Sequence, residues 1–106
     1  MRRGEIWWAE LEPPAGRRPV VLLSRDEAYS VRSLVIVAPV TTRNRHIPSE
    51  VFLGPSEGMP QECVANLDTM TTIPKDCLRN RLTTLSPEKL EEIELAIHFA
   101  LGMETR

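Results

Sequence analysis

The chain has 106 residues and an apolar fraction of 42%, which fits one globular domain with its own core and argues against intrinsic disorder. The net charge is -2, and no apolar run approaches the ~20 residues of a membrane helix. The N-terminus begins with basic residues, as a signal peptide does, but Glu5 and Glu10 interrupt the apolar segment that would have to follow. We therefore expect a cytoplasmic protein. Two cysteines, Cys63 and Cys77, are too few for a disulfide scaffold or a metal cluster. We expect both to be buried thiols, and the alternative is one disulfide between them.

The strands expected in the first half follow from alternation and β-branching. Residues 4–12 (GEIWWAELE) alternate and predict a strand, and residues 13–16 (PPAG) form its connection. Residues 19–24 predict a short buried strand that begins at Pro19, and residues 25–33 one helical turn. Residues 34–42 (LVIVAPVTT) predict the strongest strand. Because Pro39 cannot donate to a ladder, we expect this strand to lie at an edge or to be bulged there.

The second half adds shorter strands and one clear helix. Residues 43–49 predict a basic loop, 50–54 a strand, 55–61 a loop, 63–73 a strand that becomes irregular, and 78–85 another strand. Ser86 is a good N-cap and Gly102 a good C-cap for a helix between them. Its apolar stripe is Leu90, Ile93, Ile97 and Leu101, widened by Ala96 and Ala100. Short strands without helical crossovers predict a mainly β chain, a small antiparallel barrel with a C-terminal helix, in a single domain over residues 1–106.

The charge is distributed unevenly along the chain. Residues 1–81 carry 11 Lys and Arg against 10 Asp and Glu, whereas residues 82–106 carry 2 against 5. The basic clusters are Arg2–Arg3, Arg17–Arg18, Arg43 with Arg45 and His46, Lys75, and Arg79 with Arg81. Such clusters can hold a polyanion despite the net charge, because binding depends on the local field. Composition alone leaves open the alternative that they are solvated surface charges.

No catalytic signature of a serine hydrolase, a P-loop enzyme or a zinc protease occurs in the chain, and no carboxylate cluster would hold magnesium. We therefore expect no metal and no cofactor. Arg18 precedes Pro19, which favours an extended backbone and places a guanidinium at a strand entrance, where it can grip a phosphate. The alternative is a surface arginine paired with Glu10 or Glu12.

Other polar residues stand at strand ends or within apolar strands. The hydroxyls of Thr41 and Thr42 can donate to a phosphate, or these residues simply end a strand. Asn66 and Asp68 can read a base edge, or they hold a loop.

Five segments in order resemble the MazF/PemK family of type II toxin–antitoxin endoribonucleases: RRGEIWWAELEP, RRPVVLLS, IVAPVTT, VANLDTMTTI and LSPEKLEEIELAIHFALG. The resemblance implies an SH3-like barrel, a homodimer, and a cognate antitoxin that blocks the RNA groove. It implies metal-independent, sequence-specific cleavage of single-stranded RNA, which leaves a 2′,3′-cyclic phosphate and a 5′-hydroxyl. By position it implies that Arg18 and Thr41 are catalytic. Candidate RNA contacts are Arg17, Thr42, Arg43, Arg45, Asn66 and Asp68; Asp68 is also a candidate proton acceptor.

The chain departs from this family at several positions. The connection before Arg18 is unusually short, and Thr69 and Thr71 stand where the family carries Gln and a basic residue. Some members carry Arg at the position of Asn66. Two other functions therefore stay open: a toxin of the same fold that binds DNA gyrase without cutting RNA, and an inactive homologue that only binds antitoxin.

Overall fold

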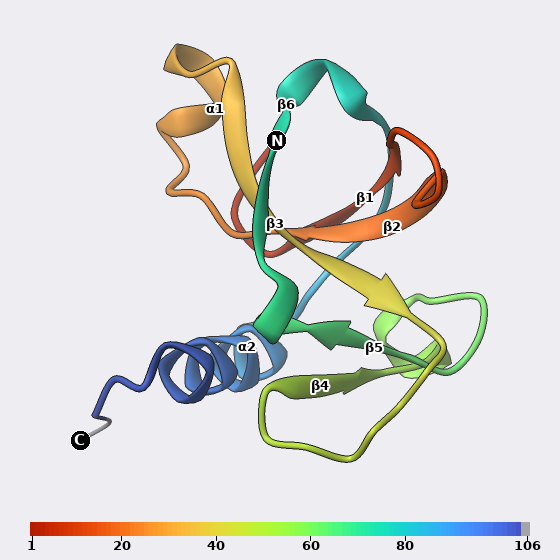
Figure 1. Cartoon of the computed structure of the whole chain (residues 1–106), viewed down its shortest axis with the longest axis vertical. Coiled ribbons are helices and arrows are strands. Elements are labelled where there is room, and N and C mark those ends of the chain that lie inside the picture. The colour runs from red at the N-terminus through yellow and green to blue at the C-terminus, as the bar shows by residue number, and fades with distance from the viewer. Residues whose placement is uncertain (105–106) are drawn as a thin grey trace.

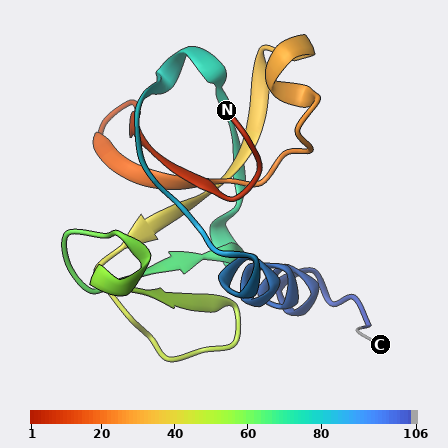
Figure 2. The same cartoon turned by 180° about the vertical axis from the view of Figure 1, so that it is seen from behind.

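The computed structural model describes residues 1–104, and the predicted domain limit at residue 106 lies outside them. This part of the chain forms one antiparallel seven-stranded sheet and a C-terminal helix (Figures 1 and 2). The strands are β1 (Glu5–Glu10), β2 (Arg17–Leu22), β3 (Leu34–Thr41), β4 (Glu50–Leu53), β5 (Cys63–Asn66), β6 (Thr71–Pro74) and β7 (Leu78–Thr84). The helices are α1 (Ala28–Val31) and α2 (Pro87–Leu101), with short 3₁₀ turns η1 (Pro55–Glu57), η2 (Leu67–Thr69) and η3 (Lys75–Cys77). The predicted mainly β chain with a C-terminal helix is confirmed.

β3 holds the sheet together, because it pairs with three other strands. Residues 37–39 pair with β2, residues 34–37 with β6, and residues 40–41 with β5. The prediction for Pro39 was an edge position or a bulge. The edge position is wrong, and the recorded pairings of β3 within residues 1–104 show no register shift at Pro39. Besides β2, β3 pairs with β6 up to Val37 and with β5 from Val40. Pro39 lies between these two pairings, so its missing N–H interrupts neither of them.

The central strands separate two apolar cores, because adjacent residues of a strand point to opposite faces. Val21 and Ala38 face the first core, which β4, β5 and α2 complete. Val20 and Val37 face the second core, which β6, β7 and α1 complete. Figures 1 and 2 show α2 beside the β4–β5 hairpin and α1 at the opposite end of the molecule. Alternate residues of β2 and β3 therefore face different cores.

The C-terminal helix begins and ends where the sequence predicts. The Ser86 hydroxyl accepts a hydrogen bond from a backbone N–H of the first turn, and Gly102 adopts a left-handed conformation with φ +69°. Ile93 and Ala96 are buried in the first core. Leu101 ends the predicted apolar stripe, but 59% of it is exposed among the described residues. The last turn of α2 extends beyond the sheet (Figure 1).

Both cysteines are free thiols. Cys63 is buried in the first core, and Cys77 packs against the second, so the structure does not join them. Burial raises the pKa of the Cys63 thiol above its ordinary value. The expectation of buried thiols is confirmed for Cys63, whereas Cys77 is only partly buried.

Glu5 is a buried carboxylate with several donors around it. Its Oε1 accepts hydrogen bonds from Trp7 Nε1 at 2.9 Å and from the Arg2 backbone N–H at 3.1 Å, and Arg81 lies 3.5 Å from Oε2. Burial opposes ionisation, but these hydrogen bonds and the neighbouring positive charges outweigh it and lower the pKa of Glu5. The ionised Glu5 carboxylate therefore stabilises the start of β1.

Candidate active site

Arg17 and Arg18 are the first two residues of β2, so this strand begins two residues earlier than the sequence predicts. At positions 17–19 the recorded pairing is with β1 alone, which tolerates the missing N–H of Pro19 inside the strand. The two arginines point to opposite faces. The guanidinium carbon of Arg17 lies 4.8 Å from the centroid of the Trp8 ring. Arg18 lines a cleft on the other face, so the two side chains serve different surfaces.

The cleft around Arg18, here called the Arg18 cleft, has a volume of about 350 Å³. It is lined by Leu11, Ala15, Arg18, Pro39, Thr41, Arg45, Asn66, Thr69 and Thr71. The fold thereby brings together four residues that the sequence nominated and that lie far apart along the chain: Arg18, Thr41, Arg45 and Asn66. No acidic side chain is among the lining residues. An open, cationic cleft of this kind suits an anionic ligand.

Arg18 is a partly buried cation without a protein partner. Its Nε is buried and makes no hydrogen bond, and none of the ion pairs recorded in residues 1–104 includes it. The alternative that Arg18 pairs with Glu10 is not realised, because Glu10 lies 3.6 Å from Arg79 instead. Glu12 has no ion pair either in this part of the chain. A half-buried guanidinium without a partner is costly, and an anion in the cleft would relieve that cost.

The hydroxyl of Thr41 reaches the same cleft from the last residue of β3. Its Oγ1 accepts a hydrogen bond from the Arg43 backbone N–H at 3.2 Å. Because the oxygen already accepts, its own O–H is free to donate into the cleft. Thr42 lies outside the Arg18 cleft and lines a second pocket, and the Arg43 side chain is exposed in the loop that follows.

The remaining predicted site residues have structural partners. Arg45 lines the cleft, but Glu50 lies 3.3 Å from its guanidinium and neutralises part of its charge. Asn66 lines the cleft and caps η2, its Oδ1 accepting from the Asp68 backbone N–H. The Asp68 carboxylate accepts from the buried Ser49 hydroxyl and does not line the cleft. The structure therefore does not bring Asp68 into the Arg18 cleft.

The short connection before Arg18 is a compact turn. The Leu11 backbone N–H donates to the Gly16 carbonyl at 3.0 Å, and the Ala15 N–H donates to the Glu12 carbonyl at 3.1 Å. Leu11 and Ala15 thereby become one wall of the Arg18 cleft. A loop this short and hydrogen-bonded to itself cannot extend far over a ligand.

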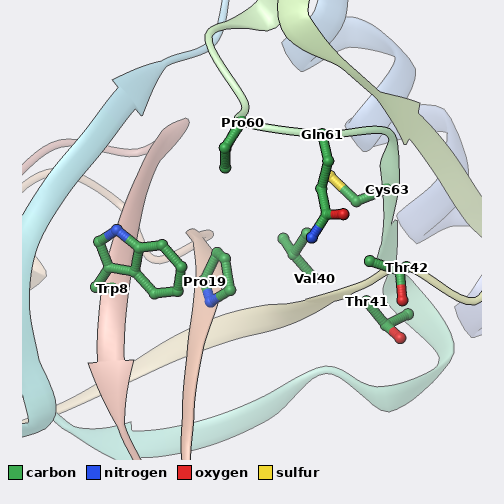
Figure 3. A pocket seen from close by; sticks show the side chains of 8 residues that line it. All are labelled: Trp8, Pro19, Val40, Thr41, Thr42, Pro60, Gln61 and Cys63. Atoms are coloured by element: carbon green, nitrogen blue, oxygen red, sulfur yellow. The ribbon is translucent and has the colours of Figure 1, made fainter.

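A second pocket lies on the face to which Arg17 belongs, and we call it the Trp8 pocket (Figure 3). It has a volume of about 210 Å³ and is lined by Trp8, Pro19, Val40, Thr41, Thr42, Pro60, Gln61 and Cys63. Thr41 lines both this pocket and the Arg18 cleft, so the two hollows meet at the end of β3.

Sequence reasoning missed Trp8 and Gln61 as site residues. The alternation of β1 places Trp8 and Trp7 on opposite faces, but only the register that pairs Trp8 with Pro19 shows which one reaches a pocket. Gln61 comes from a loop, where no periodicity signals its direction. Thr69 and Thr71 line the Arg18 cleft, so the substitutions noted in the sequence fall inside the site.

Among residues 1–104 no three His, Cys, Asp or Glu side chains lie close enough together to hold a metal ion. Within the same residues, neither helix has the length and apolarity required to cross a membrane.

Comparison with known proteins identifies the family. The family described as PemK-like, MazF-like toxins of type II toxin–antitoxin systems matches residues 2–101. The chain is 41% identical over 93 residues to the probable endoribonuclease MazF2 of Mycobacterium tuberculosis, covering 87% of this chain and 89% of that protein. It is 34% identical to the endoribonuclease MazF of Staphylococcus saprophyticus, covering 99% and 94% of the two chains.

Solved structures agree with this similarity. The toxin MazF-mt6 of Mycobacterium tuberculosis superimposes with a TM-score of 0.87 at 29% identity, over 95% of this chain and 99% of that one. A mycobacterial endoribonuclease solved in complex with its cognate antitoxin gives 0.87 at 27% identity, over 100% and 99% of the chains. The predicted barrel fold is thereby confirmed, and the chain belongs to the PemK-like, MazF-like toxin family of type II toxin–antitoxin systems.

Proposed function

We propose that this toxin is an endoribonuclease that cleaves single-stranded RNA in the Arg18 cleft, at a specific sequence and without a metal. The observation that carries the proposal is the partly buried Arg18 guanidinium, which has no recorded partner within residues 1–104 and lies in one cleft with the Thr41 hydroxyl. The similar proteins of Mycobacterium tuberculosis and Staphylococcus saprophyticus are named endoribonucleases, which supports the same activity here.

The chemistry requires little of the protein, because RNA supplies its own nucleophile. The 2′-oxygen attacks the adjacent phosphorus, the bond to the 5′-oxygen of the next nucleotide breaks, and that oxygen leaves with a proton. The products are a 2′,3′-cyclic phosphate and a 5′-hydroxyl. Negative charge on the phosphate oxygens grows toward the transition state, and Arg18 can meet it with two parallel N–H donors while Thr41 donates its O–H.

Proton transfer in this site does not pass through a carboxylate or a histidine. Neither kind of side chain lines the Arg18 cleft, and Asp68 is engaged with Ser49 outside it. The proton of the 2′-hydroxyl therefore passes to a phosphate oxygen or to water. Catalysis then rests on orientation and charge stabilisation, with Arg18 supplying the charge that a metal supplies in other nucleases.

The RNA backbone extends from the cleft over neighbouring basic residues. Arg43 and Arg45 follow β3 in the loop of residues 42–49, and Arg17 lies on the opposite face of β2 from Arg18. Together with Thr42 and Asn66, these residues bind the RNA on both sides of the cleaved bond. Because cations release counterions from RNA, binding should weaken as salt rises.

We include a homodimer and an antitoxin partner in this proposal. Exposed apolar side chains on β3 (Leu34, Ile36) and on α2 (Leu95, Phe99) offer surface for protein contacts. The mycobacterial neighbour was solved with its cognate antitoxin, and we expect an antitoxin segment to cover the RNA site here. The molecular mass in solution, measured alone and with the antitoxin, checks both partners. Action on mRNA places the toxin in the bacterial cytoplasm.

The deciding experiment is cleavage of a long single-stranded RNA by the purified protein in excess EDTA. We expect discrete products whose 5′ ends accept phosphate from a kinase without prior phosphatase treatment, because they carry a hydroxyl. A matched oligonucleotide with 2′-deoxyribose at the mapped site should stay intact, since it lacks the nucleophile. No products at all would refute the proposal, and inhibition of gyrase supercoiling or antitoxin binding by the same inert protein would favour one of the two other functions.

A further inference from the structure

The Trp8 pocket touches the proposed reaction centre, but the proposed chemistry does not use it. Thr41 lines both hollows, so a ligand group in the pocket lies next to whatever the Arg18 cleft holds. The pocket volume of about 210 Å³ is several times the ~30 Å³ share of one liquid water molecule. It is large enough for a flat ring and far too small for a folded peptide element.

The walls of the pocket suit a planar, weakly polar group. Trp8, Pro19 and Val40 form the apolar side, as Figure 3 shows. The guanidinium of Arg17 lies 4.8 Å from the Trp8 ring centroid, which fixes a cation beside the aromatic surface. Aromatic side chains flanked by arginine are a common platform for nucleobases, each stacked base contributing about 1–3 kcal/mol.

Two polar side chains in the pocket are free to bind a ligand. Gln61 and Thr42 line it, and neither side chain makes a hydrogen bond within residues 1–104. The Gln61 amide points into the pocket opposite Trp8 (Figure 3). An amide offers one acceptor and two donors side by side, a pattern complementary to the hydrogen-bonding edge of a base.

The lining of the pocket favours a neutral group, because it offers no charged side chain to pair with an anion or a cation. None of the lining side chains is Lys, Arg, Asp or Glu, and Arg17 lies outside the lining at the Trp8 ring. Burial raises the pKa of the Cys63 thiol, so that wall stays neutral. A neutral base can enter while its phosphate stays outside, near Arg17 or Arg18.

We propose that the Trp8 pocket binds the base of one nucleotide flanking the cleaved phosphate, with Trp8 stacking on it and Gln61 selecting its identity. This rests on the proposed nuclease function and adds the residues that set sequence specificity at one position. The remaining positions of the recognition sequence are read elsewhere.

The first test compares cleavage maps of Gln61→Leu and wild type on one long RNA, read by primer extension. Leucine matches the size of glutamine but cannot form hydrogen bonds. We expect discrimination to fall roughly 10- to 100-fold at a single position beside the cut, and to persist at all others. Ser56→Ala is the control, because Ser56 belongs to the same loop region and does not line the pocket. An unchanged map for Gln61→Leu would overturn the proposal.

The second test follows Trp8 directly by fluorescence in a Trp7→Phe background, where Trp8 is the remaining indole. The probe is the mapped RNA oligonucleotide with 2′-deoxyribose at the cut site. We expect saturable quenching, also in Arg18→Ala, because stacking does not require cleavage. Absence of quenching at concentrations that inhibit cleavage, or quenching by an antitoxin peptide but not by the oligonucleotide, would overturn the base pocket. If wild type cleaves no RNA, a set of unmodified single-stranded oligonucleotides replaces this probe, and saturable quenching by one of them would count against the nuclease function alone.

Discussion

Replacement of Arg18 by Ala tests the proposed reaction centre most directly. Among residues 1–104 it removes the one cleft-lining cation without a recorded ion pair, since Arg45 stays next to Glu50 at 3.3 Å. Loss of a single transition-state donor costs about 10²–10³ in rate, and loss of a phosphate-stabilising arginine about 10³–10⁵. We expect kcat to fall about 10³-fold, which corresponds to about 4 kcal/mol of transition-state stabilisation.

The same substitution should leave the fold intact. Arg18 Nε has no hydrogen-bond partner and Arg18 forms no ion pair among the described residues, so alanine removes no recorded ion pair and loses only the packing of a partly buried side chain. The free energy of unfolding should change by less than about 1 kcal/mol. Urea unfolding and single-turnover cleavage on one preparation give both quantities.

Arg32→Ala provides the matched control. Arg32 is exposed and caps the C-terminus of α1. Figure 1 shows α1 at the end of the molecule away from β4 and β5, and Arg32 does not line the Arg18 cleft, so the variant removes the same charge outside it. We expect nearly wild-type cleavage from this variant. A folded Arg18→Ala protein that cleaves as fast as Arg32→Ala would refute the assignment of Arg18, because remote charge would then explain any difference from wild type.

Three other predictions follow from single side chains. Thr41→Ala should lower kcat about 10²-fold whereas Thr41→Ser should keep most of it, because serine retains the donor; single-turnover rates check this. Ile93→Ala should cost about 2–5 kcal/mol in urea unfolding because Ile93 is fully buried, whereas Leu101→Ala on the same helix should change little. Glu5 has a folded-state pKa below its ordinary 4.5, so its contribution is complete above that pH and is lost as pH falls through the lowered value. Unfolding measured across acidic pH should show this loss, and Glu5→Gln should remove that part of the dependence; equal pH profiles would contradict it.

Local patterns determined the elements of this protein. Alternation and β-branching predicted the strands that became β1, β3 and β7, and Ser86 and Gly102 set the limits of α2 as capping chemistry requires. These features depend on neighbours within one strand or one helical turn, so no distant contact was needed to predict them. The same locality produced the errors: Pro39 predicted an edge, and Leu101 a buried position.

The candidate site shows a similar division. Arg18 before Pro19 and Thr41 at the end of a strong strand could be nominated from sequence, and the fold brings both into one cleft. Sequence could not show that Arg17 points the other way, or that Asp68 is held by Ser49 away from the cleft. Those facts depend on loop conformation and on strand register. A shift of one residue in register moves every side chain of a strand to the other face of the sheet.

The amino-acid sequence alone therefore predicted most of the strands and the C-terminal helix, nominated the residues that could contact a phosphate, and showed which family the chain resembles. Only the tertiary structure decided that β3 lies between three partners and that the two arginines serve two surfaces. It alone placed Trp8 opposite Gln61 across a pocket that meets the Arg18 cleft at Thr41. The physical reason is that side-chain chemistry and backbone propensity are local, whereas a site is made by pairing and packing between segments distant in the chain.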